Sequence, residues 1–123
     1  MKPLPVQKKL DEELPIPTIW RQTIANIVNT LQTNNIRTAV PNVEINDEDR
    51  VRVRANILAY GDSLINLPEQ SWLTSIYVWS GKKWDVLVDL FTKHEGASDL
   101  VLFLEVTEKN AGFKFIVCDV HVP

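Results

Sequence analysis

The chain has 123 residues, of which 45% are hydrophobic and 24% charged, and its net charge is −3 at pH 7. This composition predicts one globular domain with an ordinary core and excludes a disordered chain or a coiled coil. The acidic balance argues against nucleic acid as a partner, because binding to phosphates needs a concentrated basic surface. The single cysteine, Cys118, excludes an internal disulfide.

The N-terminal residues contain no apolar run long enough for a signal peptide. No stretch approaches the roughly 18 apolar residues of a membrane span. We therefore expect a cytoplasmic protein with no membrane partner. Residues 1–17 carry four prolines and are expected to form an irregular arm with at most one short helical turn around residues 6–14. Residues 18–123 are expected to form a single domain.

The spacing of apolar residues predicts a helix over residues 18–34. Thr18 is its expected N-cap, and Asn34 and Asn35 are expected to end it, because Asn tolerates left-handed geometry. The apolar stripe of this helix consists of Trp20, Ile24, Ile27, Val28 and Leu31.

Residues 47–60 fit two patterns. A helix is favoured by Asn46 as a cap, by three acidic residues in the first turn and by Gly61 at the exit. The alternation of apolar and polar residues over 51–57 is typical of a strand. We favour the helix, on which one apolar face would carry Val51, Ala55 and Leu58.

From Trp72 onward the hydrophobic period changes to two. This pattern predicts strands over residues 73–79, 84–91, 99–107 and 113–120, joined by turns that contain glycine. The order of elements predicts an α+β fold, with N-terminal helices packed on one face of a four-stranded or larger antiparallel meander. A cone-like shape is one arrangement that would fit.

The densest polar cluster lies between the two predicted hairpins and contains Asp89, His94, Glu95 and Asp99. Such side chains can serve acid–base catalysis, bind a divalent metal, or form a binding edge for a basic partner, and Asp119 and His121 are placed to approach them. The alternative is that Asp89, Thr92, Ser98 and Asp99 only cap a turn. No spaced catalytic, metal or cofactor motif is present, so we predict neither an enzyme nor a metal or cofactor site.

The aromatic residues allow two interpretations. Trp72, Trp79 and Trp84 are expected to fill the core or to clamp the first hairpin across its strands. Alternatively, Tyr77 and Trp79 face outward and anchor a partner. Cys118 is expected to be a small buried hydrophobe.

The last forty residues carry seven acidic and three basic side chains. An acidic sheet surface of this kind would steer a basic protein toward it. The other explanation is ordinary solubility.

The run from Trp84 to Leu100 and the Asp119-Val120-His121-Val122 segment resemble an uncharacterised group of small bacterial proteins, whose members carry a similar W..VDL.T.EG.SDL run and a D.HV C-terminus. The resemblance covers about residues 20–123 and implies no activity. His94 departs from the pattern of the group, so any role for it is specific to this chain.

Small acidic bacterial proteins of this kind are similar in character to immunity proteins, which bind and block a toxin delivered by neighbouring cells. The similarity implies a non-enzymatic protein-binding domain whose partner is a cognate toxin, for example a basic nuclease. The alternatives are a small-ligand-binding or enzymatic domain with a pocket near Asp89 and Asp99, and an oligomeric structural module. The predicted partner-binding residues are Tyr77, Trp79, Asp85, Asp89, His94, Glu95, Asp99 and Glu105.

Overall fold

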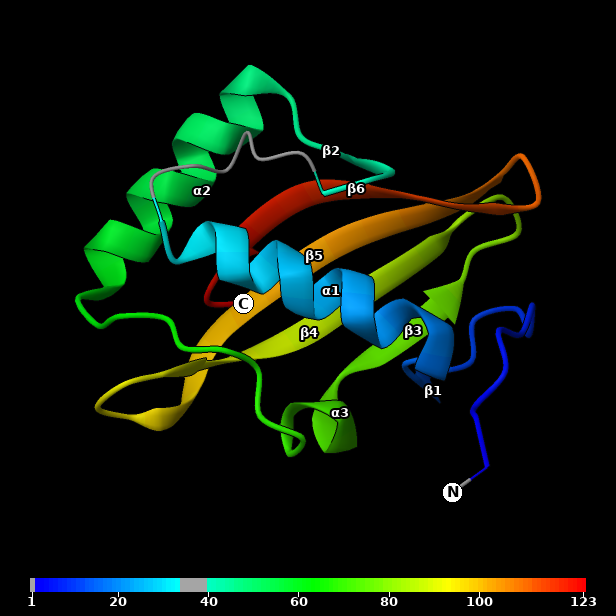
Figure 1. The fold of residues 1–123 in the computed structure, drawn as a ribbon, viewed down its shortest axis with the longest axis horizontal. Helices are drawn as coiled ribbons and strands as arrows, with labels where there is room; N and C mark the ends of the chain where they lie inside the picture. The colour runs from blue at the N-terminus through cyan, green and yellow to red at the C-terminus, as the bar shows by residue number, and fades with distance from the viewer. Residues whose placement is uncertain (1, 34–39) are drawn as a thin grey trace.

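The computed structural model describes residues 2–33 and 40–123, and within them the chain forms three helices and six strands of an α+β domain (Figure 1). The helices are α1 (Thr18–Leu31), α2 (Asp47–Tyr60) and α3 (Ser71–Thr74). The strands are β1 (Leu14–Pro15), β2 (Val43–Glu44), β3 (Ile76–Trp79), β4 (Trp84–Thr92), β5 (Gly96–Lys109) and β6 (Gly112–His121). They form one sheet in the order β1-β3-β4-β5-β6-β2.

The predicted antiparallel meander is confirmed as β3 to β6. The short strand β1 extends it antiparallel to β3, and β2 pairs in parallel with β6 at the other edge. The first predicted strand began too early, because residues 71–74 form α3. Here the Ser71 hydroxyl donates to the Asp89 carbonyl at 2.7 Å and the Asp89 amide donates to Ser75 Oγ at 2.9 Å. Two serine side chains thus replace the backbone partner that a longer β3 would have supplied.

Helix α1 buries all five residues of its predicted apolar stripe. Its expected cap was wrong by one position, because Pro17 precedes the helix and Thr18 is its first residue. Thr18 Oγ1 instead accepts a hydrogen bond of 2.7 Å from the Leu4 amide and so ties the N-terminal arm to the helix. The helix ends at Leu31, and the expected stop at Asn34 and Asn35 lies outside the described residues.

The helical interpretation of residues 47–60 is confirmed. The Asn46 side chain accepts a hydrogen bond from the Asp49 amide, and Gly61 ends the helix with a φ of 83°. The apolar face predicted for this helix, however, is on the outside. Val51 and Leu58 are 63% and 62% exposed, because the helix turns the face with Val53 and Ile57 into the core.

The N-terminal arm contains no helical turn within residues 2–17 and packs against the sheet. Leu10 forms a bridge to Trp79, and β1 pairs with β3. Ile16 is fully buried, and its carbonyl accepts hydrogen bonds from the Arg21 guanidinium at 3.1 and 3.2 Å. The arm therefore completes one edge of the fold.

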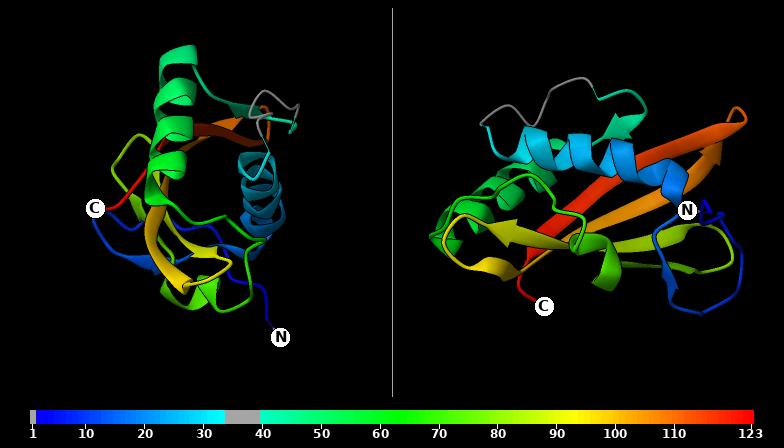
Figure 2. Two further views of the ribbon diagram at one scale, coloured as in Figure 1. Left: turned by 90° about the vertical axis from the view of Figure 1, so that its left-hand side faces the viewer. Right: turned by 60° about the horizontal axis from the view of Figure 1, so that its bottom comes forward.

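The core lies between the sheet and helix α1, which crosses one sheet face, and α2 closes it along the β6 edge with Val53 and Ile57 (Figures 1 and 2). Trp20 is at its centre, and its ring lies 5.3 to 5.4 Å from the rings of Tyr77, Trp84 and Phe113. In β4 every second side chain points into this core, and Trp84, Val86, Val88 and Leu90 are fully buried. No helix in the described residues is long and apolar enough to cross a membrane.

The opposite face of the sheet is open. In both views of Figure 2, the described helices lie on or beside the inner face and none lies over the other. This open side of the meander is called the outer face below.

Candidate functional site

The outer face is built by the alternation of the central strands. In β4 the side chains of Asp85, Leu87, Asp89 and Phe91 alternate with the buried ones and point away from the helices. Residues paired directly across antiparallel strands share a face, so the register extends this surface over its neighbours. The outer face comprises Ile76, Val78, Asp85, Leu87, Asp89, Phe91, Val101, Phe103, Glu105, Thr107, Lys114, Ile116, Asp119 and His121.

An apolar row crosses the middle of the outer face. Ile76 pairs with Leu87, and Leu87 pairs with Phe103. All three side chains are partly exposed. The Phe103 ring stacks on the His121 ring, with centroids 4.5 Å apart and planes 6° from parallel. The row is a continuous apolar strip on a surface that no described helix covers.

A charge cluster borders this row. Lys83 Nζ lies 2.8 Å from both Asp85 Oδ1 and Glu105 Oε1. The hydrogen bond to Asp85, followed by that to Glu105, holds the pKa of the Lys83 ammonium above its ordinary value. One cation thus serves two carboxylates, and the cluster retains a negative charge.

Asp89 and Asp119 add two further carboxylates. In the described part of the chain, no hydrogen bond or ion pair engages the Asp89 carboxylate, although its backbone groups bind Ser71 and Ser75. Asp119 Oδ1 lies 3.3 Å from Arg52 Nε, and its Oδ2 lies 2.9 Å from His121 Nδ1. The border of the apolar row is therefore predominantly acidic.

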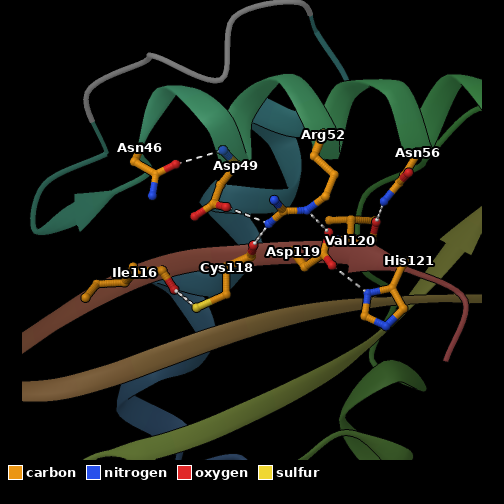
Figure 3. Close-up of polar contacts among 9 residues, drawn as sticks. All are labelled: Asn46, Asp49, Arg52, Asn56, Ile116, Cys118, Asp119, Val120 and His121. Atoms are coloured by element: carbon orange, nitrogen blue, oxygen red, sulfur yellow. Dashed lines mark hydrogen bonds and ion pairs between the residues drawn. The ribbon is translucent and has the colours of Figure 1, made fainter.

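Helix α2 is fastened to the free edge of β6 by two side chains (Figure 3). The Arg52 guanidinium donates to Asp49 at 2.5 Å and to the Cys118 carbonyl at 2.8 Å, and Asn56 Nδ2 donates to the Val120 carbonyl at 2.9 Å. The hydrogen bonds to Asp49 and Asp119 raise the pKa of Arg52. These contacts satisfy carbonyl groups of β6 beyond the short pairing with β2.

The β4–β5 turn is held by Asp62, which the sequence analysis did not single out. The Asp62 carboxylate accepts hydrogen bonds from the backbone amides of His94 and Glu95 at 3.1 and 3.2 Å and lies 2.9 Å from His94 Nδ1. The hydrogen bond from the His94 side chain is the main reason why the pKa of Asp62 is well below its usual range. Asp62 follows Gly61 at the exit of α2, and its contact with a turn 32 residues away has no local signal in the sequence.

Tyr60 binds the same turn from α2. Its hydroxyl donates to the Glu95 carboxylate and accepts a hydrogen bond of 3.1 Å from the Asp99 amide. The bond to Glu95 raises the pKa of Tyr60. Tyr60 thus holds the turn in place through the Glu95 side chain and the Asp99 backbone.

The polar cluster predicted around residues 89–99 does not converge on one point. Asp89 lies on the outer face, whereas His94, Glu95 and Asp99 lie at the turn. Of the predicted turn-capping side chains, Ser98 does bond backbone groups, since its Oγ donates to the Leu90 carbonyl at 2.8 Å. Asp62 caps the amides of the turn itself.

Tyr77 was wrongly predicted as an exposed anchor. It is 1% exposed on the inner face, and its hydroxyl accepts a hydrogen bond of 2.9 Å from the Gln7 amide. Trp79 is partly buried on the same side, with its ring 4.7 Å from that of Trp84 and the Lys8 ammonium 5.2 Å from its centroid. Neither ring contributes to the outer face.

Two pockets are lined by none of the three residues of the outer-face apolar row. One, of about 320 Å³, lies between the C-terminal ends of α1 and α2 and residues 61–64. The other, of about 270 Å³, is lined by residues that include Tyr60, Leu100 and His121. Neither is lined by Asp89 or Asp99, where the alternative prediction placed a pocket. Within residues 2–33 and 40–123, no three His, Cys, Asp or Glu side chains are grouped so that they could hold a metal ion.

Residues 27–123 match the model of a family described as "Domain of unknown function (DUF7668)". The match agrees with the predicted membership of an uncharacterised family. No curated protein and no solved structure matches the chain.

Proposed function

The chain belongs to the DUF7668 family, and we propose that it is a non-enzymatic protein-binding domain that docks its partner on the outer face of the sheet. The observation that carries the proposal is the apolar row of Ile76, Leu87 and Phe103, which lies on a surface without a covering helix among the described residues. Protein interfaces typically combine an apolar centre with a polar rim. The outer face has this arrangement.

The charges of the rim favour a basic partner. Asp85 and Glu105 share one lysine, and Asp89 has no counter-ion among the described residues. Lys114, at the far end of the face, is paired with Glu44 at 3.0 Å and leaves this balance unchanged. Complementary charge accelerates the encounter of two proteins and disfavours wrong partners.

We infer that the partner is a toxin delivered by neighbouring cells, for example a basic nuclease, and that the chain is its immunity protein in the cytoplasm. Support comes from the acidic rim and from the resemblance to small acidic bacterial proteins. Occlusion of an active site needs a broad surface, and the outer face supplies one without needing a catalytic group of its own.

The test uses the protein encoded by the gene that neighbours the gene of this chain. The two proteins are co-expressed, and growth protection and the Kd of the purified pair are measured. Leu87→Arg places a charge in the apolar row and is expected to weaken binding at least about tenfold and to abolish protection. Leu73→Arg is the matched control, because Leu73 is 84% exposed in α3 and away from the row.

Asp89→Lys tests the rim separately, with a lower association rate expected and a smaller change in dissociation. Its control is Glu48→Lys, which makes the same charge change in the exposed first turn of α2. Equal affinities for Leu87→Arg and Leu73→Arg, both folded by circular dichroism, would refute the outer face as the interface. A neighbouring gene product that is not toxic to cells and does not bind this chain would refute the immunity role.

A further inference from the structure

The pocket of about 320 Å³ has features that the outer-face proposal does not use. Arg54, Ile57 and Leu58 contribute from α2, and Gly61 and Leu64 contribute from the segment that follows. The spacing of residues 54, 57 and 58 places them along one side of α2, and Gly61 follows at its C-terminal end. Leu31, at the end of α1, lines the opposite wall.

The pocket holds a cation that has no counter-ion within residues 2–33 and 40–123. Arg50 pairs with Asp47, and Arg52 pairs with Asp49 and Asp119. In the same helix, the Arg54 guanidinium has no ion pair or hydrogen bond to any residue that the structure describes. A guanidinium stays protonated at all accessible pH values and matches a carboxylate with two parallel hydrogen bonds.

Asp62 is the one acidic side chain among the described lining residues, and no ion pair joins it to Arg54. The Asp62 carboxylate accepts hydrogen bonds from the amides of Ser63, His94 and Glu95, and it faces His94 Nδ1. The Asp62 carboxylate is thus occupied by its hydrogen bonds to the β4–β5 turn and to Ser63. The positive charge of Arg54 is therefore not neutralised by any described residue of the pocket.

The other walls are mixed, because Gln32, Ser63 and His94 add polar side chains beside an apolar part. Leu31, Ile57 and Leu64 belong to the buried core and line the pocket beside Arg54. The volume lies at the small end of the range for ligand pockets, which is roughly 300 to 1,000 Å³. A ligand for such a site combines one anionic group with a short apolar body.

We propose that this pocket binds a small aliphatic carboxylate, whose anionic group pairs with Arg54 while its chain packs on Leu31, Ile57 and Leu64. The site is separate from the outer face. Its occupancy is therefore independent of whether the outer face binds a toxin.

Octanoate is the probe for this site, titrated into the full chain and followed by backbone amide NMR. We expect saturable shifts centred on Gly61, Ser63 and Leu64. Arg54→Gln is expected to weaken binding at least about tenfold, because a charge-assisted bidentate contact is lost. Arg50→Gln, one turn earlier in the same helix and paired outside the pocket, is the matched control and should bind as the wild type does.

Two further probes separate the parts of the proposal. Uncharged 1-octanol should bind more weakly than octanoate, because it cannot pair with Arg54. Inorganic phosphate should also bind more weakly, because it leaves the apolar walls unfilled. The proposal is overturned by unsaturable octanoate shifts, by equal affinity of Arg54→Gln and Arg50→Gln, or by phosphate or octanol binding as tightly as octanoate.

Discussion

Arg52 in α2 and Cys118 in β6 are joined by a hydrogen bond of 2.8 Å from the guanidinium to the backbone carbonyl. The same guanidinium binds Asp49 on its own helix and Asp119 on the strand. A side chain of α2 therefore occupies an edge that would otherwise offer unpaired backbone groups to another strand. Exposed edges of this kind promote association between sheets.

Arg52→Met should lower the melting temperature more than Arg50→Met does, because the one ion pair of Arg50 in the described part of the chain is with Asp47, in the first turn of its own helix. Thermal unfolding followed by circular dichroism measures this difference. Amide exchange in residues 117–121 should accelerate in Arg52→Met alone. Equal melting temperatures of the two variants would show that the contact to Cys118 adds nothing to stability.

Trp20→Ala should reduce the free energy of unfolding by about 3–5 kcal/mol, since it removes the ring on which four other aromatic rings converge. Its neighbour Ile19 is 64% exposed, so Ile19→Ala should change stability by less than about 0.5 kcal/mol. Urea titration compares the two. Ile24→Val, a milder change in the same stripe with an expected cost of about 0.5–1.5 kcal/mol, tests the core if Trp20→Ala does not fold.

The Asp62 carboxylate should make stability depend on acid pH. Its pKa in the folded protein is lowered, chiefly by the hydrogen bond from His94, so its contribution is fully present above the unfolded-state pKa, about 4. The contribution is lost as the pH falls below that value. Melting temperatures from pH 7 down to pH 3 should therefore fall more steeply for the wild type than for Asp62→Asn. Parallel curves would contradict the role of the charge at the turn.

Cys118 should react slowly in the folded protein. Burial is the main cause that raises the pKa of its thiol to about 11, and its sulfur donates to the Ile116 carbonyl at 3.6 Å. Iodoacetamide at pH 8 should modify the native chain far more slowly than the chain unfolded in guanidinium chloride, because the thiolate is the reactive species. Comparable rates would show that the thiol is freely ionised in the fold.

Local patterns predicted the elements whose burial follows from their own spacing. The stripe of α1 and the alternation of β4 are of this kind, because one helix period or one strand period assigns each side chain to a face. The period alone does not show which of the two faces is buried. A period of two separates Tyr77 from Val78 but does not say which of them meets the helices, and Tyr77 was assigned to the wrong side. The same ambiguity placed Val51 and Leu58 on the packed side of α2.

The polar contacts of the turn needed the tertiary structure. Asp62 holds the backbone of His94 and Glu95 across a separation of 32 and 33 residues, and Tyr60 reaches Glu95 and Asp99 from α2. The sequence showed that acidic residues were dense near the turn. It could not show that an aspartate from another element binds the turn, or that Asp89 lies apart on the outer face.

The outer face as an interface is tested most directly by methyl NMR of the chain bound to the product of its neighbouring gene. Leu87, Val101 and Ile116 lie on the outer face, whereas the exposed methyl groups of Leu58 and Leu73 lie on helices away from the apolar row. We expect large shift changes for the first three and none for the other two. Changes confined to Leu58 or Leu73, with the sheet methyl groups unmoved, would contradict the outer face as the site of binding.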